Sequence, residues 1–150
     1  MGKTRTIKQQ TFIHAPADKV FRALTDPRLL KKWFLQSARI YPRKGGNYTF
    51  TWQGGYSHSG KVLAYARHKS LSLSWPAYWK GKPLGTTRAS FRLRPKDSGT
   101  VVTMTHSGFK NGDKWIQTYG GTCSGWAYFL TNLKSVLQYG RDLRSPHDNI

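Results

Sequence analysis

Apolar residues recur with a period near four in two helical segments, after the first strand and near the C-terminus, and with a period of two in the segment between them. Residues 4–13, TRTIKQQTFI, mix Thr, Ile and Phe with polar partners and predict a first strand. Residues 15–24, APADKVFRAL, predict a helix with Pro16 in its first turn and an apolar face formed by Val20, Phe21 and Leu24. A second short helix should follow, with Asp26 as its N-cap, Pro27 at its first position, and an inward face formed by Leu29, Leu30 and Trp33.

From residue 37 onward, the period of two predicts a series of short strands. Segments such as NYTFTW, SLSLSW, RASFRLR and TVVTMTH alternate apolar with polar residues, and glycines and prolines mark the loops between them. The inward faces would hold Tyr48, Phe50, Trp52, Leu71, Leu73, Trp75, Ala89, Phe91, Leu93, Val102, Met104 and His106. Strands of this kind form an antiparallel sheet with one face in water.

The last apolar pattern predicts a long helix within residues 120–144, with one stripe formed by Trp126, Phe129, Leu130, Leu133 and Leu137. Gly140 suits its C-terminal stop, and residues 141–150 are expected to form a loose tail. We therefore expect a single α+β domain over residues 1–150, with its core in about 4–140. A curved antiparallel sheet should wrap around the long C-terminal helix, with two short helices after the first strand.

Acidic residues are scarce in this sequence. The 150 residues include 25 Lys and Arg against 6 Asp and Glu, which gives a formal net charge of +19. All the acids are aspartates, and several stand where turns or helix caps favour them, such as Asp26 and Asp97. Selective loss of surface glutamate with added Lys and Arg is the pattern of deliberate positive supercharging. A naturally basic surface that evolved for polyanions is the alternative.

Cytoplasmic residence is the default expectation, and nothing in the sequence requires an oxidising compartment. No segment approaches the roughly 20 consecutive apolar residues of a membrane span, and MGKTRTIKQQ lacks the apolar stretch of a signal peptide. Cys123 is the only cysteine, which excludes an intramolecular disulfide and any site built from several cysteines. Strong self-repulsion predicts a monomer unless anions bridge the subunits.

Five phrases occur together in one order: IHAPADKVFRALTDPRLLKKWF, GGNYTF, GKVLAYARHKSLSLSW, GTVVTMTHSGF and GWAYFLTNLKSVL. Over about residues 7–140 they resemble the START-like helix-grip (SRPBCC) superfamily, and within it the domains named after the activator of the heat-shock-protein-ninety ATPase. The resemblance implies a deep cavity between sheet and long helix that holds a hydrophobic or amphipathic small molecule. Some members of this superfamily only bind ligands and others are enzymes. This sequence departs from the pattern because it has few of the acidic residues usually found on the helices and strands, which concerns partner recognition rather than fold.

The candidate ligand-binding residues are inward-facing apolar side chains and one histidine. Aromatic walls with few polar groups suit apolar ligands, although the same residues can also form packed core. The pattern leaves both readings open for each residue. The candidates are Trp33, Phe50, Trp52, Trp75, Phe91, Met104, His106, Trp126 and Leu130.

Catalytic and metal-binding signals are weak. His106 could move a proton or hold a ligand headgroup, or it could be a hydrogen-bonded structural residue at a strand end. We expect His58 in a solvated turn, His14 at a strand–helix junction, and Cys123 near the start of the last helix without a catalytic signature around it. The sequence holds no HExxH, paired cysteines, clustered carboxylates or phosphate loop, so we expect no catalytic residue, metal or cofactor.

The candidate polyanion-contacting residues are Arg88, Arg92 and Arg94 on one strand, with Lys31 and Lys32 on the second helix. Because the cations are spread out and the aromatics point inward, we expect salt-sensitive, sequence-indifferent attraction to nucleic acids and anionic surfaces. The leading hypothesis is a small-molecule binding module without catalytic machinery. The alternatives are a chaperone-interaction protein that stimulates an ATPase, a hydrolase or cyclase that uses His106, and polyanion binding as the role itself.

Overall fold

The computed structural model describes residues 3–145, which form strands and helices in the order that the sequence pattern predicts. The strands are β1 (Arg5–Ile13), β2 (Ser37–Ile40), β3 (Asn47–Thr51), β4 (Ser57–Ala66), β5 (Ser70–Trp79), β6 (Lys82–Lys96) and β7 (Gly99–Phe109). The helices are α1 (Ala17–Thr25), α2 (Pro27–Trp33) and α3 (Asp113–Tyr139).

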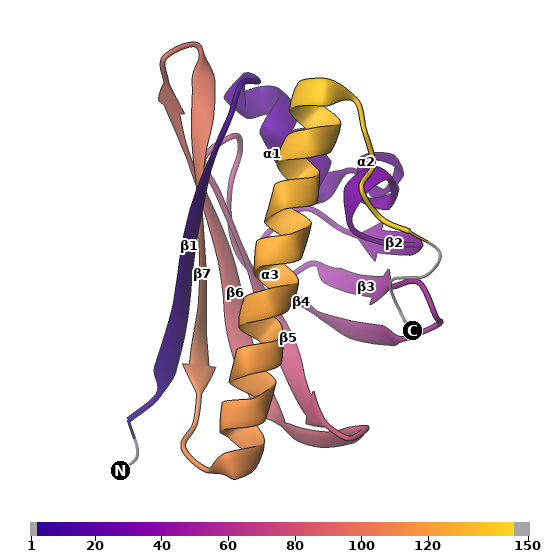
Figure 1. Ribbon diagram of the computed structural model, residues 1–150, viewed down its shortest axis with the longest axis vertical. Coiled ribbons are helices and arrows are strands. Elements are labelled where there is room, and N and C mark those ends of the chain that lie inside the picture. Colours follow the sequence, from indigo (N-terminus) through magenta and orange to yellow (C-terminus); the bar gives the residue numbers. More distant parts are fainter. Residues whose placement is uncertain (1–2, 146–150) are drawn as a thin grey trace.

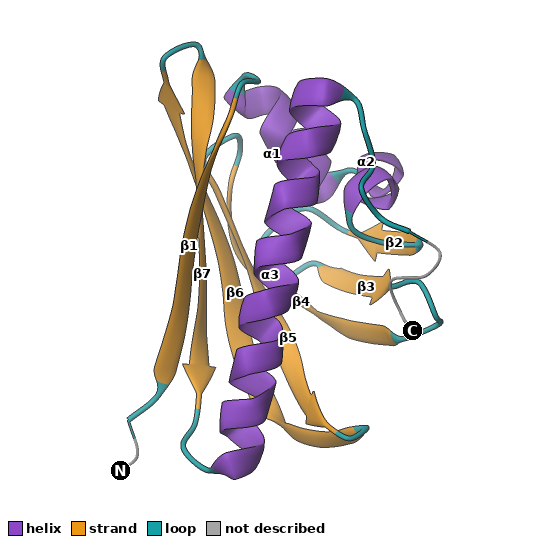
Figure 2. Cartoon of the chain, in the orientation of Figure 1, coloured by secondary structure: helices purple, strands orange, loops and turns teal. Residues whose placement is uncertain are grey.

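One antiparallel sheet forms the body of the molecule, with strand order β1-β7-β6-β5-β4-β3-β2. The strands from β2 to β7 pair with their neighbours in sequence, and β1 returns to the far edge beside β7. The sheet curves, and α3 runs along its inner side with α1 and α2 packed near one end of the helix (Figures 1 and 2). The predicted α+β helix-grip fold is confirmed.

The junction between α1 and α2 follows the sequence signals closely. The Asp26 side chain accepts a hydrogen bond from the Arg28 backbone N–H at 2.9 Å, and Pro27 occupies the first turn of α2, where a missing N–H costs nothing. Trp33 donates from Nε1 to the carbonyl oxygen of Ala23 at 2.8 Å, which fixes α2 against α1. This bond satisfies the indole N–H of a side chain that is only 1% exposed.

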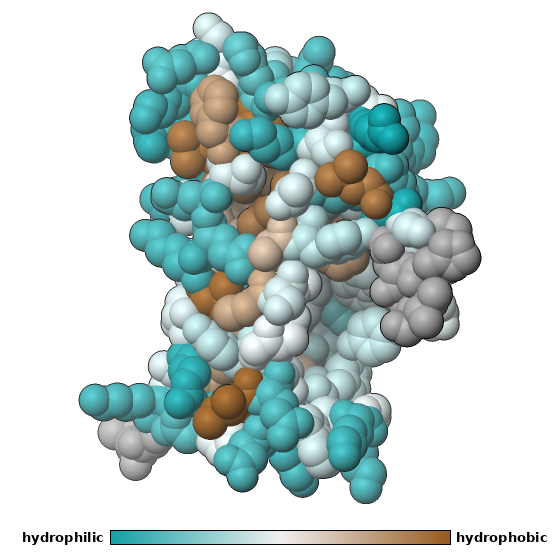
Figure 3. Space-filling view, viewed as in Figure 1, coloured by the Kyte–Doolittle hydropathy of each residue, from teal (hydrophilic) through white to brown (hydrophobic). Residues whose placement is uncertain are grey.

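The two faces of the sheet differ in chemistry. Inward residues of β6 and β7 such as Phe91 and Met104 are buried, whereas the outward positions of β6 carry exposed arginines and Ser90. Ser90 pairs its hydroxyl with that of Ser72 at 2.8 Å. Figure 3 shows a mostly hydrophilic surface in which apolar side chains gather in separate small groups. Most of the large apolar side chains lie in the buried core.

The helix α3 begins at Asp113, several residues earlier than the glycine-rich segment suggests. Glycine costs about 1 kcal/mol in a helix interior, so Gly120 and Gly121 weaken the local signal. Tertiary contacts offset that cost, because Thr118 donates to the Tyr78 carbonyl oxygen and Gln117 accepts from Trp79 Nε1, both at 3.0 Å. The expectation that Cys123 lies near the helix start is therefore wrong. At the other end, Gly140 adopts φ 70° and ends the helix as predicted.

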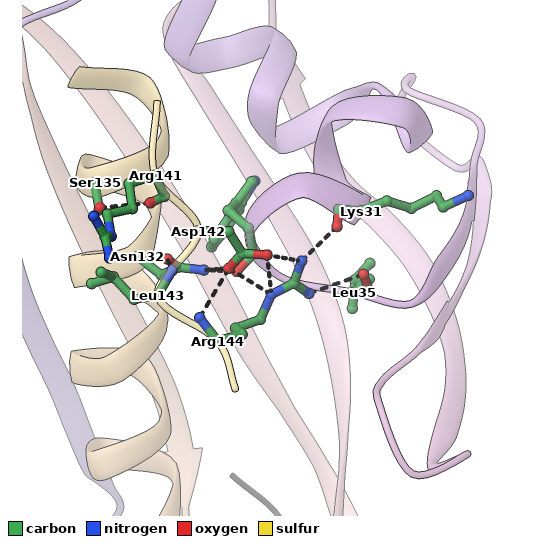
Figure 4. A network of polar contacts seen from close by, with 9 residues as sticks. Lys31, Leu35, Asn132, Ser135, Arg141, Asp142, Leu143 and Arg144 are labelled. Atoms are coloured by element: carbon green, nitrogen blue, oxygen red, sulfur yellow. Dashed lines mark hydrogen bonds and ion pairs between the residues drawn. The ribbon is translucent and has the colours of Figure 1, made fainter. Parts of the chain in front are cut away.

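The segment after α3 is held in place over residues 141–144, contrary to the expected loose tail. The Arg144 guanidinium donates to the carbonyl oxygens of Lys31 at 2.6 Å and Leu35 at 3.1 Å, and it pairs with Asp142 at 3.0 Å (Figure 4). Asn132 of α3 donates to Asp142 at 2.9 Å and accepts from the Leu143 N–H. We call this network the C-terminal latch. The rest of the expected tail, residues 146–150, lies outside the described residues.

Replacing Arg144 by Gln should destabilise the fold. The Arg144 side chain is only 7% exposed, and its loss leaves two carbonyl oxygens and a carboxylate without their charged donor. We expect a loss of about 2 kcal/mol in the free energy of unfolding and a melting temperature about 5 °C lower, measured by thermal and urea unfolding. Arg141→Gln removes the same charge from an exposed position and should change little. Equal losses in both variants would mean that the latch contributes nothing beyond its charge.

Candidate functional site

Two adjoining cavities lie between α3 and the sheet. The first has a volume of about 160 Å³ and is lined by Phe34, Trp52, Tyr56, His58, Trp75, Thr122, Gly125, Trp126 and Phe129. The second has a volume of about 310 Å³, and its lining includes Tyr56, Trp75, Thr87, His106, Phe109, Thr118 and Thr122. Because Tyr56, Trp75 and Thr122 line both, these three side chains form the boundary between the cavities. An apolar cavity of about 150 Å³ is large enough to bind benzene.

The walls of the first cavity are aromatic and hold one another in place. Phe34 stacks on Trp33 with a centroid distance of 4.7 Å and meets Phe129 edge-on at 4.9 Å. Trp75 of β5 lies 5.3 Å from Trp126 of α3, so the sheet and the helix meet through two indoles. Aromatic pairs at these distances prefer tilted or edge-on geometry, which fixes the shape of the wall.

His58 reaches the first cavity from β4, where it is 5% exposed. Its Nε2 lies 3.1 Å from the Tyr48 hydroxyl, and the hydroxyl in turn donates to the Ser74 carbonyl oxygen. Gly60, which pairs with Tyr48 across β3 and β4, makes room for this arrangement, since a Cβ there would come within 2.6 Å of the tyrosine ring. The expectation of a solvated turn histidine is therefore wrong.

His106 links the sheet to α3 beside the second cavity. It is fully buried, and its Nδ1 accepts a hydrogen bond from Trp126 Nε1 at 2.9 Å. An Nδ1 that accepts leaves the proton on Nε2, which donates to the Thr87 hydroxyl at 2.6 Å. The Thr87 hydroxyl in turn donates a hydrogen bond to the Trp75 carbonyl oxygen at 2.8 Å. Both ring nitrogens are thus hydrogen-bonded to protein partners, which agrees with the interpretation of His106 as a structural residue.

Burial keeps both histidines neutral. Loss of hydration lowers the pKa of His58 to about 4. Burial also lowers the pKa of His106 to about 3, with a further contribution from the neighbouring His58. The first cavity therefore presents a neutral, largely apolar lining inside a strongly cationic protein.

The predicted ligand-binding residues fall into three groups. Trp52, Trp75 and Trp126 line the first cavity, and His106 lines the second. Trp33, Phe50 and Phe91 surround only a void of about 10 Å³ and act as packed core. Met104 and Leu130 are also buried in the core and line neither cavity.

Several lining residues were missed by the pattern analysis: Phe34, Tyr56, His58, Thr122 and Gly125. Tyr56 and His58 continue the period of two that leads into Val62, so the alternation could have revealed them. Phe34 follows the last residue of α2, where neither helical nor strand spacing applies. Gly125 has no side chain whose direction a pattern could predict.

The predicted polyanion-contacting residues lie in two separate places. Arg88, Arg92 and Arg94 are exposed on the outward side of β6, whereas Lys31 and Lys32 are exposed on α2. Within residues 3–145, no cluster of three or more His, Cys, Asp or Glu side chains could hold a metal ion. Among the described helices, none is long and apolar enough to cross a membrane.

Because His58 and His106 are neutral in the folded protein, we expect its free energy of unfolding to fall in mild acid. Because their folded-state pKa values lie below the ordinary value of 6.5, the unfolded chain takes up protons first. The stability that the two neutral histidines contribute to the folded state is fully present above about pH 6.5. It is lost as the pH falls toward 4, the folded-state pKa of His58. In this pH range each histidine should add about 1.4 kcal/mol per pH unit to the slope of the free energy of unfolding against pH. Urea unfolding at several pH values should show a smaller slope for His58→Phe than for the parent, and an identical slope would contradict this assignment.

The chain matches the family described as Activator of Hsp90 ATPase homolog 1-like protein over residues 14–138. No curated protein sequence matches it. Solved structures agree with the family match. Protein MLL2253 from Mesorhizobium loti is 29% identical with a TM-score of 0.78, and the match covers 89% of this chain and 96% of that one.

Two further structures show the same fold. The Aha1 dimer from Colwellia psychrerythraea is 27% identical with a TM-score of 0.75, over 91% of this chain and 98% of that one. CalU16 from Micromonospora echinospora is 27% identical with a TM-score of 0.67, over 93% of this chain and 78% of that one. Since the family match spans far more than half of the 150 residues, this chain belongs to the family of Activator of Hsp90 ATPase homolog 1-like proteins.

Proposed function

We propose that this protein is a cytoplasmic binding module for a small apolar or amphipathic molecule, held in the first cavity. The observation that carries the proposal is the aromatic lining, in which three indoles and two phenylalanines surround about 160 Å³. Such walls gain free energy by removing apolar ligand surface from water, at about 25 cal/mol per Å². The shared boundary at Tyr56, Trp75 and Thr122 lets a longer ligand extend toward the second cavity.

Binding without turnover fits this lining better than catalysis does. A general base needs a free lone pair and a pKa near the working pH. His106 has neither, because Trp126 and Thr87 occupy both of its ring nitrogens and burial lowers its pKa to about 3. The hydrolase or cyclase hypothesis therefore lacks a base at this position.

The family name points to a chaperone partner, and a relative from Colwellia psychrerythraea is described as a dimer. We favour ligand binding and a monomer for this chain. A formal charge of +19 opposes close approach of two copies, and acidic side chains for recognising a basic partner are few.

Filling the cavity from α3 tests the ligand-binding proposal. Gly125 lines the first cavity, and a Cβ at this position would meet nothing within 4 Å, so Gly125→Leu should fill the space without a clash. Gly121→Leu is the matched control, because Gly121 is exposed on the same helix and also has open space around its Cβ position. Both changes remove a helical glycine and should stabilise α3 similarly.

Tryptophan fluorescence titrations with a panel of apolar and amphipathic molecules provide the readout, in roughly 0.5 M salt so that surface charge is screened. We expect saturable binding by the parent and by Gly121→Leu, with at least tenfold weaker binding by Gly125→Leu. Equal affinity in all three proteins would place the ligand outside the first cavity. No binding by any of them would reject the proposal.

A second candidate function is non-specific polyanion attraction. The specific observation is that none of the strands carries an acidic residue, while Arg88, Arg92 and Arg94 follow one another along the exposed side of β6. At the strand rise of about 3.4 Å per residue, Arg92 and Arg94 are about 7 Å apart and Arg88 is about 14 Å from Arg92, so the row allows several phosphate contacts at once. The basic surface has this consequence whether it is designed or natural.

Salt dependence tests this second function. Affinity for a fluorescent single-stranded oligonucleotide should fall steeply between about 50 and 200 mM salt and should ignore base sequence. Affinity on a logarithmic scale falls linearly with the logarithm of the salt concentration, and the steepness reports the number of phosphate contacts. Changing Arg88, Arg92 and Arg94 together to Gln should reduce this steepness by the equivalent of about three contacts. Lys31→Gln with Lys32→Gln on α2 is the comparison, and we expect a smaller reduction. Tight binding of one sequence in high salt would contradict sequence-indifferent attraction.

A further inference from the structure

Lys80 is the one charged side chain among the described residues that line the two cavities. It lines the second cavity together with Tyr78 and Gly81 of the β5–β6 hairpin. The first cavity is lined by no Lys, Arg, Asp or Glu. His106, which also lines the second cavity, stays neutral because burial lowers its pKa to about 3. The adjoining cavities therefore combine an apolar end with a single cationic group beyond their shared boundary.

The Lys80 ammonium has no carboxylate partner within residues 3–145. The two ion pairs of this part of the chain lie elsewhere, at the start of α2 and in the C-terminal latch. Lys80 Nζ instead lies 4.7 Å from the centroid of the Trp79 ring, and Lys114 Nζ of α3 lies 4.9 Å from the same centroid. Each cation is attracted to the indole, but the two ammonium groups repel each other. An anion beside them would offset this repulsion.

Lys80 also occupies a backbone conformation that favours other residues. With φ 48° at Lys80 and 76° at Gly81, the turn between β5 and β6 has two left-handed positions. Asn, Asp and Gly are preferred at the first of these, because other side chains are strained there. Strain of this kind often marks a functional position. A lysine is kept here although it makes the turn less stable.

The hydroxyl groups of the second cavity do not replace Lys80 as the partner of an anion. Thr87, Thr118 and Thr122 each donate their proton to a backbone carbonyl oxygen. Tyr56 keeps its phenol proton because burial raises its pKa, so it is a neutral donor. Lys80 is exposed and has three donors on a flexible stem. It is the lining group whose charge favours an anion over a neutral molecule of the same shape.

We propose that the two cavities hold one amphipathic monoanion, an apolar ring or chain that ends in a carboxylate, with its apolar part in the first cavity and its carboxylate at Lys80. This inference rests on the proposed binding function and names its ligand class. Because the cavities share Tyr56, Trp75 and Thr122, one molecule can occupy both. The aromatic walls remove its apolar part from water, and one lining ammonium matches one negative charge.

A matched ligand pair isolates the charge. The ω-phenylalkanoates and their primary amides have nearly the same shape, and only the acids are charged. A series from 3-phenylpropionate to 8-phenyloctanoate varies the reach beyond the first cavity. We expect the parent protein to prefer the acid about fourfold once the chain reaches Lys80, the effect of one exposed ion pair. Calorimetry in roughly 0.5 M salt, where long-range attraction is screened, measures each affinity.

Three variants assign the preference to a residue. Lys80→Gln should bind acid and amide equally. Lys82→Gln is the matched control and should keep the preference, because Lys82 is exposed on the same hairpin and lines neither cavity. Lys80→Asn should lose the preference and also raise the melting temperature, since Asn adopts the left-handed turn conformation more readily. A merely structural role for Lys80 would not combine a more stable fold with loss of acid recognition.

The outcomes separate this inference from the proposed function. Acid preference in the parent and in Lys82→Gln, with loss in both Lys80 variants, supports the inference. Equal loss in Lys80→Gln and Lys82→Gln assigns the preference to bulk charge and overturns it. Acid binding that Gly125→Leu does not weaken also overturns it, because the apolar part would then lie outside the first cavity.

Two further results concern both proposals. Equal binding of acid and amide by the parent at every chain length overturns the inference and leaves apolar ligand binding intact. Failure of the whole series to bind, while other apolar molecules bind, has the same meaning. If no apolar molecule binds the parent, the proposed function fails together with the inference.

Discussion

The hydrogen-bond chain through His106 is the constraint on which the cavity depends. Trp126 donates to His106, His106 donates to Thr87, and Thr87 donates to the carbonyl oxygen of Trp75. Each bond has one possible direction once the first is set, so the chain accepts only a neutral imidazole in one tautomer. Because these bonds run from α3 to β7, β6 and β5, they fix the helix at one height above the sheet.

This fixed height explains why aromatic residues can enclose space instead of filling it. A core of flexible aliphatic side chains would relax into a void, since close packing is favoured everywhere in a protein interior. Trp126 is restrained by its bond to His106, and Phe34 is wedged between Trp33 and Phe129. The glycine at position 125 then leaves open the space that a side chain on α3 would occupy. The C-terminal latch restrains α2, from which Phe34 follows.

The fold could be predicted from the sequence because its signals are local and agree with one another. The periods of two and four, the Asp26 cap and the Gly140 stop each specify an element without knowledge of the others. The candidate site depends instead on which inward residues face a gap, and this is decided by tertiary packing. Trp75 and Phe91 have the same pattern, yet one lines the first cavity and the other only a small void. The position of His58 was predicted wrongly because its serine and glycine neighbours suggest a turn, whereas here Gly60 makes room for the Tyr48 ring within β4.

The basic exterior and the neutral interior can coexist because they face different media. Charges on the outer side of β6 interact through water and are screened within about 8–10 Å at moderate salt. Their repulsion is spread over the surface and costs little per residue. The groups around the cavity interact through a low dielectric, where one unpaired charge would outweigh many surface charges. A surface with few acidic side chains is therefore compatible with an undisturbed site. A single charged side chain in the aromatic wall of the cavity would destabilise it. The lining of the first cavity therefore stays neutral and largely apolar in a chain whose formal charge is +19.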